Sequence, residues 1–355
     1  MAIVLAVDAM GGDHGVNVTI PASINFLKDH LNVNLILVGD RDTIYKHIKN
    51  HLSEYSERIE VVHTTQVVDM DEPPQNAMRN KKDSSMRVAI NLVKEGRAQA
   101  IVSAGNTGAL MATARYVLRT MEGIDRPAIA KILPTIKDDV CILDLGANLE
   151  SSPEHLLQFG IMGAQLMRAV TGKPAPSVGI LNIGTEEIKG HEHIKKAYEL
   201  LKNSGLNFYG NVEGNDINKG TVDVVVCDGF TGNVALKTLE GMAKMIAFFI
   251  KEEFTRSIFT KLIGAIAYPV LHKIKLRADT RKYNGAILLG LNGIVIKSHG
   301  GADEFGFYYA LLQAYHEVNS GVINLLHDYL NKHKQLLDKI EIKSELLEFK
   351  DLNML

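Results

Sequence analysis

The 355-residue chain has no tryptophan, two cysteines and a formal net charge of only −2. Cys141 and Cys227 stand in apolar, strand-like segments, and their spacing fits neither a metal site nor a disulfide framework, so we expect a reducing, cytoplasmic environment. The small net charge gives no argument for binding nucleic acid. No apolar run is long enough to span a bilayer, and the first residues lack the basic segment of a signal peptide.

Several well-known site patterns are also missing. The chain has no Walker loop, no Gly-x-Gly-x-x-Gly dinucleotide fingerprint and no Gly-x-Ser-x-Gly nucleophile elbow. The run His191-Glu192-His193 lacks the spacing that puts two histidines on one helix face for a metal. We therefore expect neither a metal nor an organic cofactor.

Short β-branched runs alternate along the chain with segments whose apolar residues recur at helical spacing. This alternation predicts an α/β fold of three layers, a mainly parallel sheet with helices on both faces. The expected strands are Ile3–Val7, Asn34–Val38, Ile59–Val62, Ala100–Val102, Ala128–Leu133, Cys141–Asp144, Ser177–Asn182, Asn207–Gly210, Val222–Val226 and Gly293–Lys297. No linker-like stretch divides residues 1–330, so we expect one domain there and a helical tail at 331–355, although a division near 150–175 or 205–220 stays open.

Five of the runs end in a turn rich in Gly, Asn, Asp or Ser that opens a helix. The turns lie within Val4–Asp13, Ile101–Leu110, Cys141–Leu149, Val222–Leu236 and Ile294–Asp303. If the strands are parallel, these helix N-termini gather at one edge of the sheet, where N–H groups and helix dipoles attract an anion. The pattern predicts a phosphate site.

Two of the turns are near copies, Ser103–Leu110 and Asp228–Leu236, and supply the expected phosphate donors. These donors are Ser103, Gly105, Asn106, Thr107, Thr231 and Gly232, and the Asn233 amide could also stabilise an oxyanion. For any single turn, ordinary helix capping is the alternative explanation. The remaining turn residues are expected to support the loops, since the carboxylates among them repel phosphate: Asp8, Gly11, Gly12, Asp13, Asp144, Asn148 and Asp228.

A phosphate dianion in a closed cleft also needs a cation. Lys189 follows a strand in a glycine-bounded loop and is the candidate. His299, at another strand end, could donate to the anion or transfer a proton, although an ordinary turn histidine is the simpler interpretation.

A helical hairpin is expected over residues 234–282. Within 251–282 it carries eight Lys or Arg against three Asp or Glu, beside an apolar face. Such a surface suits an acidic protein or an anionic membrane, and a dimer interface is the alternative. The candidate contact residues are Arg256, Lys261, Ile263, Ile266, Lys273, Lys275 and Arg277.

The chain resembles the PlsX family of bacterial phosphate acyltransferases over residues 1 to about 325. The resemblance rests on five ordered motifs, Val7–Asp13, Ser103–Leu110, Gly123–Ala128, Asn182–Glu186 and Asp228–Val234. It implies transfer of a fatty acyl group from acyl carrier protein to inorganic phosphate, giving acyl phosphate for phospholipid synthesis. It also implies a fold like that of phosphotransacetylases and isocitrate or isopropylmalate dehydrogenases, a homodimer, and peripheral association with the inner membrane face. Lys189 and Asn233 match positions linked to the family's active site.

Two alternatives remain open at this point. One is a phosphotransacetylase-like transferase that uses acyl-coenzyme A. The other is a membrane-recruited scaffold that binds acyl carrier protein without chemistry.

Overall fold

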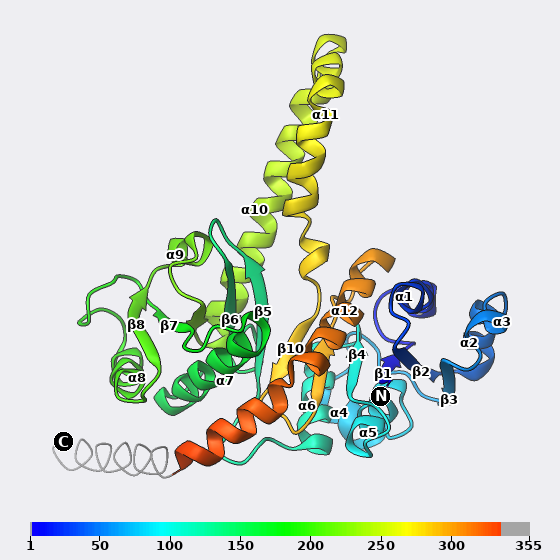
Figure 1. Cartoon of the computed structure of the whole chain (residues 1–355), viewed down its shortest axis with the longest axis horizontal. Helices are drawn as coiled ribbons and strands as arrows, with labels where there is room; N and C mark the ends of the chain where they lie inside the picture. The colour runs from blue at the N-terminus through cyan, green and yellow to red at the C-terminus, as the bar shows by residue number, and fades with distance from the viewer. Residues whose placement is uncertain (1, 335–355) are drawn as a thin grey trace.

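The structure is a computed structural model, and it describes residues 2–334. Within them, eleven strands form one sheet in the order β3-β2-β1-β4-β11-β10-β5-β6-β9-β7-β8 (Figure 1). The strands are β1 (Ile3–Asp8), β2 (Val33–Gly39), β3 (Ile59–His63), β4 (Ala100–Ser103), β5 (Ala128–Pro134), β6 (Asp139–Leu143), β7 (Ser177–Leu181), β8 (Asn207–Val212), β9 (Val224–Val226), β10 (Ala286–Leu289) and β11 (Ile294–Lys297).

The sheet changes direction in its middle. Strands β3, β2, β1, β4 and β11 are mutually parallel, and so are β6, β9, β7 and β8. Between the two groups, β10 is antiparallel to β11 and β5, and β5 is antiparallel to β6. The two parallel groups therefore run in opposite directions. The glycine turns after β1, β4 and β11 share one carboxyl edge, as expected for several of them, whereas those after β6 and β9 follow strands of the oppositely directed group.

Helices cover both faces of the sheet. They are α1 (Val16–Asp29), α2 (Arg41–Ile48), α3 (Leu52–Tyr55), α4 (Pro74–Asn80), α5 (Ser85–Lys94), α6 (Thr107–Leu118), α7 (Pro153–Thr171), α8 (Glu192–Lys202), α9 (Gly214–Lys219), α10 (Gly229–Thr255), α11 (Ile258–Ala278) and α12 (Glu304–Ser320), with a short 3-10 turn at Thr280–Tyr283. Helices α1, α7 and α12 lie against one face, and α5 and α6 pack on the other.

Alternation along each strand divides the core between the two faces. In β1, Leu5 and Val7 point into the core under α1 and α12, whereas Ala6 points toward α5 and α6. All three are fully buried. Full burial of a Leu or Val side chain contributes about 1.5–3 kcal/mol, so a strand that is apolar on both sides fits a sheet covered on both faces.

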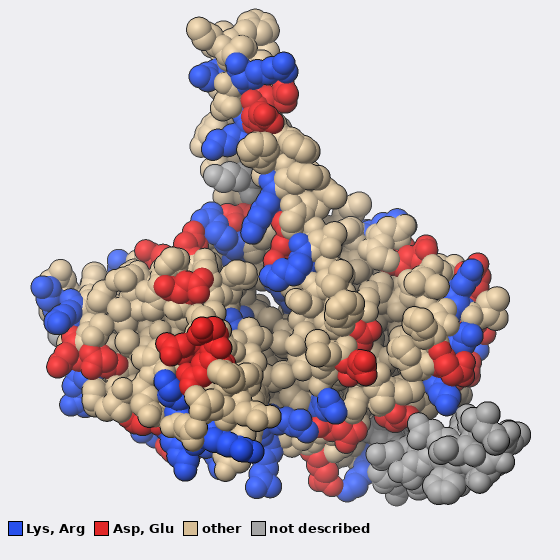
Figure 2. All heavy atoms as spheres, turned by 180° about the vertical axis from the view of Figure 1, so that it is seen from behind, with Lys and Arg blue, Asp and Glu red and all other residues tan. Residues whose placement is uncertain are grey.

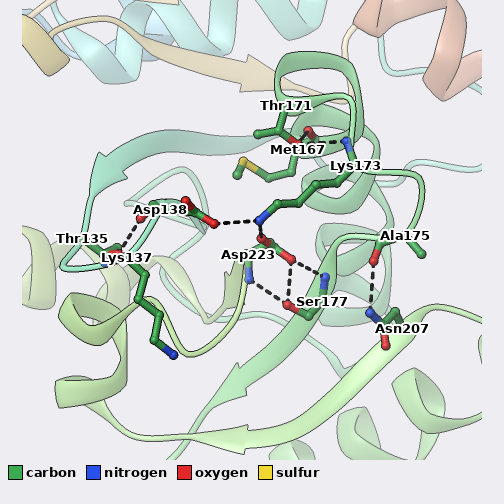
Figure 3. A network of polar contacts seen from close by, with 10 residues as sticks. All are labelled: Thr135, Lys137, Asp138, Met167, Thr171, Lys173, Ala175, Ser177, Asn207 and Asp223. Carbon is green, nitrogen blue, oxygen red and sulfur yellow. Dashed lines mark hydrogen bonds and ion pairs between the residues drawn. The ribbon is translucent and has the colours of Figure 1, made fainter.

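Polar contacts join the amino ends of strands in the β6–β9–β7 half (Figure 3). The Asp223 carboxylate accepts from the Ser177 N–H at 2.7 Å and from the Ser177 hydroxyl at 2.8 Å. It also accepts from Lys173 Nζ at 2.7 Å, and the same ammonium reaches Asp138 at 3.2 Å. These contacts fix the starts of β6, β7 and β9 relative to one another.

Helices α10 and α11 form a hairpin that projects from the body (Figure 1). Its exposed apolar residues include Ile258, Phe259 and Ile266. Within the described residues no helix has both the length and the apolarity needed to cross a membrane. After α12, residues 322–334 are also helical, and the expected tail at 335–355 lies outside the described residues.

Candidate functional site

A cleft of about 380 Å³ lies where the two oppositely directed halves of the sheet meet. Its wall is built from β5, the β6–α7 loop, α10, the start of β10, the end of β11 and the first residue of α6. The lining residues are Met70, Thr107, Ile129, Lys131, Leu145, Gly146, Asn233, Leu236, Lys237, Glu240, Asn284, Gly285, Ala286, Lys297, Ser298, His299 and Gly300. Three sequence-predicted site residues, Thr107, Asn233 and His299, therefore share one cleft although they come from distant segments.

The turn between β4 and α6 presents Thr107 to the cleft. Ser103 is fully buried, and its hydroxyl donates to Asp8 Oδ2 at 2.6 Å while accepting from Gly105 N–H at 3.0 Å. Asn106 caps α6 by accepting from Ala109 N–H, and its amide donates to the carbonyls of Met70 and Glu72. Ser103 and Asn106 thus hold the turn, and Thr107 is the residue of this turn that reaches the cleft, beside helix N–H groups without an intrahelical partner.

The start of α10 places Asn233 in the same cleft. Asp228 is the N-cap, and it accepts from the Thr231 N–H and hydroxyl, both at 2.8 Å. Gly232 packs against β6 so closely that an added Cβ would lie 1.9 Å from the Asp144 carbonyl oxygen. The contacts of Thr231 and Gly232 therefore build the helix start that orients Asn233.

The loop after β6 lies against the start of α10 and is held by Asp144. This buried carboxylate accepts from the N–H groups of Ile129, Ala147 and Asn148 at 2.7–2.9 Å and from the Asn148 side chain at 3.0 Å. Burial raises the pKa of Asp144, and the four donors oppose that rise. The Asn148 carbonyl accepts from Gly229 N–H at 2.8 Å, which ties the loop to α10.

The loop after β1 lies behind the cleft. Asp8 is buried, and burial raises the pKa of its carboxyl group, while its bond to Ser103 lowers it. A Cβ at Gly11 would lie 2.5 Å from Asp8 Oδ2, and Gly12 has φ = 91°, so both positions require glycine. Asp13 N–H donates to the Gly300 carbonyl at 3.0 Å, which fixes the loop that carries His299.

His299 lies at the end of β11 with one ring nitrogen engaged. Its Nδ1 accepts from Gly301 N–H at 3.3 Å, so the neutral ring carries its proton on Nε2. Burial, together with the charge of Lys237, lowers the pKa of His299. The ring is therefore a neutral hydrogen-bond donor near pH 7.

Lys189 lies in an exposed loop, residues 182–191, that follows β7. The described lining of the cleft does not include it. Its N–H donates to the Glu186 carbonyl, and its carbonyl accepts from the Asn182 amide. Because β7 pairs with β9 and β9 leads into α10, the loop leaves the sheet next to the strand that delivers Asn233.

Sequence reasoning missed three lysines that line the cleft, Lys131, Lys237 and Lys297. Lys131 and Lys297 each stand in an otherwise apolar strand, in the runs Ala128–Pro134 and Ile294–Lys297. A charged residue inside an apolar strand is unusual, and this was the signal that could have identified them. Among the described residues, no group of three or more His, Cys, Asp or Glu side chains is arranged to hold a metal ion.

The hairpin residues expected to contact a carrier protein or membrane lie away from the cleft. Arg256, Lys261, Ile266 and Lys273 are exposed. Figure 2 shows basic side chains at several levels of the hairpin, with a smaller acidic group among them. The side chains of Lys275 and Arg277 lie outside the described part of the chain.

Residues 3–325 match the family model described as "Fatty acid synthesis protein". A curated phosphate acyltransferase of Chromobacterium violaceum is 62% identical over 344 residues, which cover 97% of this chain and all of the relative. The chain belongs to the PlsX family of phosphate acyltransferases. The family also includes relatives in Paraburkholderia xenovorans, at 54% identity over 96% of this chain and 92% of the relative, and in Legionella pneumophila strain Paris, at 55% over 93% and 96%.

Solved structures show the same fold in more distant proteins. A phosphotransacetylase from Streptococcus pyogenes aligns with a TM-score of 0.60 at 15% identity, covering 91% of this chain and 94% of that one. The EutD phosphotransacetylase from Staphylococcus aureus aligns with a TM-score of 0.56 at 14% identity, covering 90% and 94%. The expected α/β fold, with its mostly parallel sheet and helices on both faces, is confirmed, and it is the phosphotransacetylase fold.

Proposed function

We propose that this phosphate acyltransferase moves a fatty acyl group from the thioester of acyl carrier protein to inorganic phosphate. The observation that carries the proposal is the convergence of Thr107, Asn233 and His299, from three separate segments, on one cleft that also contains lysines. Membership of the PlsX family supports the same activity.

The reaction requires the protein mainly to bind and position the two reactants. A phosphate oxygen attacks the thioester carbonyl carbon, a C–O bond forms, and the C–S bond breaks as the thiolate leaves and takes up a proton. A thioester already has a good leaving group, so no covalent enzyme intermediate is needed. The enzyme must align the two reactants and stabilise the tetrahedral oxyanion. We assign the oxyanion to the Asn233 amide and a donor role toward phosphate to Thr107 and to the Nε2–H of His299.

Lys189 is proposed to approach the cleft from the neighbouring loop when substrates bind. Its position beside the strand that leads into α10 and its exposed, glycine-bounded loop support this role. Ser103, Gly105, Asn106, Thr231 and Gly232 then act by shaping the two helix starts, together with the loop residues Asp8, Gly11, Gly12, Asp13, Asp144, Asn148 and Asp228.

The test is release of carrier thiol by the purified protein from an acyl carrier thioester, with and without phosphate. We expect phosphate-dependent release, with Lys189→Ala and Asn233→Ala strongly impaired and Lys137→Ala, an exposed lysine in the β5–β6 turn, unchanged. Equal release without phosphate would show a thioesterase and contradict the proposal.

A second candidate is a transferase that uses acyl-coenzyme A, and the shared fold with phosphotransacetylases favours it. Comparing the two thioesters at equal concentration separates these functions, because a preference for the coenzyme A donor would replace the carrier protein as substrate. Tight carrier binding without turnover of either donor would instead indicate the scaffold.

The hairpin is proposed to bind acyl carrier protein and an anionic membrane, and its excess of basic residues with exposed apolar side chains supports this. We expect Ile263→Glu with Ile266→Glu to release the protein from anionic vesicles in a flotation assay. Leu31→Glu, at an exposed apolar position on the body, is the matched control and should bind as before. Unchanged flotation of the double variant would exclude this face as the membrane contact.

We further propose that the protein is a cytoplasmic homodimer that associates peripherally with the inner membrane face. Exposed apolar side chains on the body, such as Tyr116, Leu149 and Phe230, support an interface outside the hairpin. Light scattering of the wild type and of the hairpin double variant tests this. A dimer that persists in the variant places the interface on the body, and a wild-type protein that is monomeric at working concentration contradicts the proposal.

A further inference from the structure

The cleft is more basic than its sequence motifs indicate. Lys131 from β5, Lys237 from α10 and Lys297 from β11 line it, and one carboxylate, that of Glu240, is among the described lining residues. Glu240 is shared, because its carboxylate lies 3.5 Å from Lys131 Nζ and 2.9 Å from Lys237 Nζ. Three ammonium groups and one carboxylate leave the cleft with excess positive charge, as an anion site requires.

Lys297 is the most deeply placed of the three. The residue is 9% exposed, and its ammonium donates to two backbone carbonyls, those of Ala104 at 3.4 Å and of Ser298. Within residues 2–334 no ion pair of Lys297 with a carboxylate is formed. The hydrogen bonds of this buried cation go to neutral acceptors, and an anionic ligand would offset more of its desolvation cost.

The register of the sheet places Lys297 and Lys131 at the same level. Ala286 of β10 pairs with Lys297, and the next residue, Ile287, pairs with Ala130, which precedes Lys131. The two lysines thus stand two strands apart, about 10 Å at the backbone, on the face that lines the cleft. Their long side chains can meet a single small anion from both sides.

We propose that Lys297 binds the phosphate substrate at the floor of the cleft, with Lys131 and Lys237 completing the anion site; Lys237 lies one helical turn after Asn233 on α10. The inference rests on the proposed acyltransfer, and it names the residues that hold the acyl acceptor. Phosphate held there has Thr107 and the start of α6 beside it, and Asn233, near the start of α10, is left to meet the thioester carbonyl.

Two carboxylates near Lys297 act on its ammonium group and do not contact phosphate. Asp8 at the end of β1 and Asp13 in the following loop lie near Lys297, and their charges favour its ammonium form. Burial has the larger effect and lowers the pKa of Lys297 to about 8, with Lys237 also disfavouring the charge. Because the ammonium is needed for binding, phosphate affinity should fall as the pH rises through about 8.

The experiment compares Lys297→Met, Lys297→Arg and Lys94→Met, the last an exposed lysine at the end of α5. The KM for phosphate and the KM for the acyl thioester are measured by thiol release, and binding of inorganic phosphate to the protein alone is measured by calorimetry. Loss of a charge-assisted contact should raise the phosphate KM of Lys297→Met at least about tenfold and leave the thioester KM unchanged. Lys94→Met should match the wild type, and Lys297→Arg should lose the weakening of phosphate binding above pH 8.

Lys237→Met gives a second measurement that does not depend on a buried substitution, since its side chain is 53% exposed. We expect a smaller rise in the phosphate KM. Unchanged phosphate KM in both Met variants, with phosphate-dependent thiol release intact, would overturn the assignment of the anion site and leave the acyltransferase function standing. Phosphate-independent release by the wild type would overturn the function itself.

Discussion

Replacing Asp144 by Asn tests whether one buried carboxylate organises the loop between β6 and α7. Each of its oxygens accepts from two donors, Oδ1 from the N–H groups of Ile129 and Ala147, and Oδ2 from the N–H and side-chain amide of Asn148. An Asn side chain must place its NH₂ group against one of these donor pairs in either orientation. The variant therefore loses two accepted hydrogen bonds and leaves two buried donors facing another donor.

The magnitude follows from those two contacts. An unsatisfied buried donor costs about 1–3 kcal/mol, so Asp144→Asn should lower the free energy of unfolding by about 2–6 kcal/mol. Urea denaturation followed by circular dichroism measures this loss. The kcat/KM for phosphate should also fall, because Gly146 lines the cleft and the Asn148 carbonyl holds the start of α10.

Asp228→Asn is the matched control, since it makes the same chemical change at a helix cap. There one oxygen can still accept from Thr231 N–H, and the Thr231 hydroxyl can accept from the new amide. We expect a loss below about 1 kcal/mol. Equal losses for the two variants, or a loss below 1 kcal/mol for Asp144→Asn, would refute the role given to the buried carboxylate.

Three further substitutions test other contacts. Gly232→Ala forces a Cβ against the Asp144 carbonyl, so it should lower the free energy of unfolding, measured by urea denaturation, by at least about 1–3 kcal/mol. Thiol release should also be lost. A stable, active variant would contradict the close packing of α10 on β6. Burial raises the pKa of Asp223, but its contacts with Lys173 and Ser177 outweigh burial and hold the pKa below its usual range, so its stabilisation is present above pH 4 and lost as the pH falls through the lowered pKa. The difference in unfolding free energy between wild type and Asp223→Asn should therefore shrink at acid pH, and a difference that is constant with pH would exclude the charge as its source. Arg58→Met removes donors to the carbonyls of three residues around β2 and α1 and should lower the melting temperature by several degrees, whereas an unchanged melting temperature would show that water replaces them.

Local sequence patterns were sufficient to predict most of the sheet. Each of the ten expected strands overlaps an observed strand, because β-branched runs bounded by turn residues are strong local signals. The strand that was missed, Ala286–Leu289, is short, lies between Gly285 and Gly290, and depends on antiparallel pairing with β11 and β5 for its conformation. Pairing direction is a property of the whole sheet, so its reversal at β10 and β5 could not be predicted from local patterns.

The candidate site was predicted in part for the same reason. Thr107, Asn233 and His299 stand in turn motifs that a reader of the sequence can recognise, and they line the cleft. Ser103 and Asn106 have the same side-chain chemistry, but their donors are engaged by Asp8 and by the carbonyls of Met70 and Glu72, partners that only the tertiary structure shows. Lys131 and Lys297 were not singled out in the sequence, and they stand at the same level of the cleft because β10 joins their strands in register.

Helix α10 begins at the cleft and ends at the tip of the hairpin without interruption. At 1.5 Å per residue, its 27 residues form a rod of about 40 Å. The length of this helix sets the distance between the cleft and any surface that the tip of the hairpin touches. An acyl phosphate formed in the cleft must then travel along the length of the hairpin, or leave through the surrounding solution, before it reaches that surface.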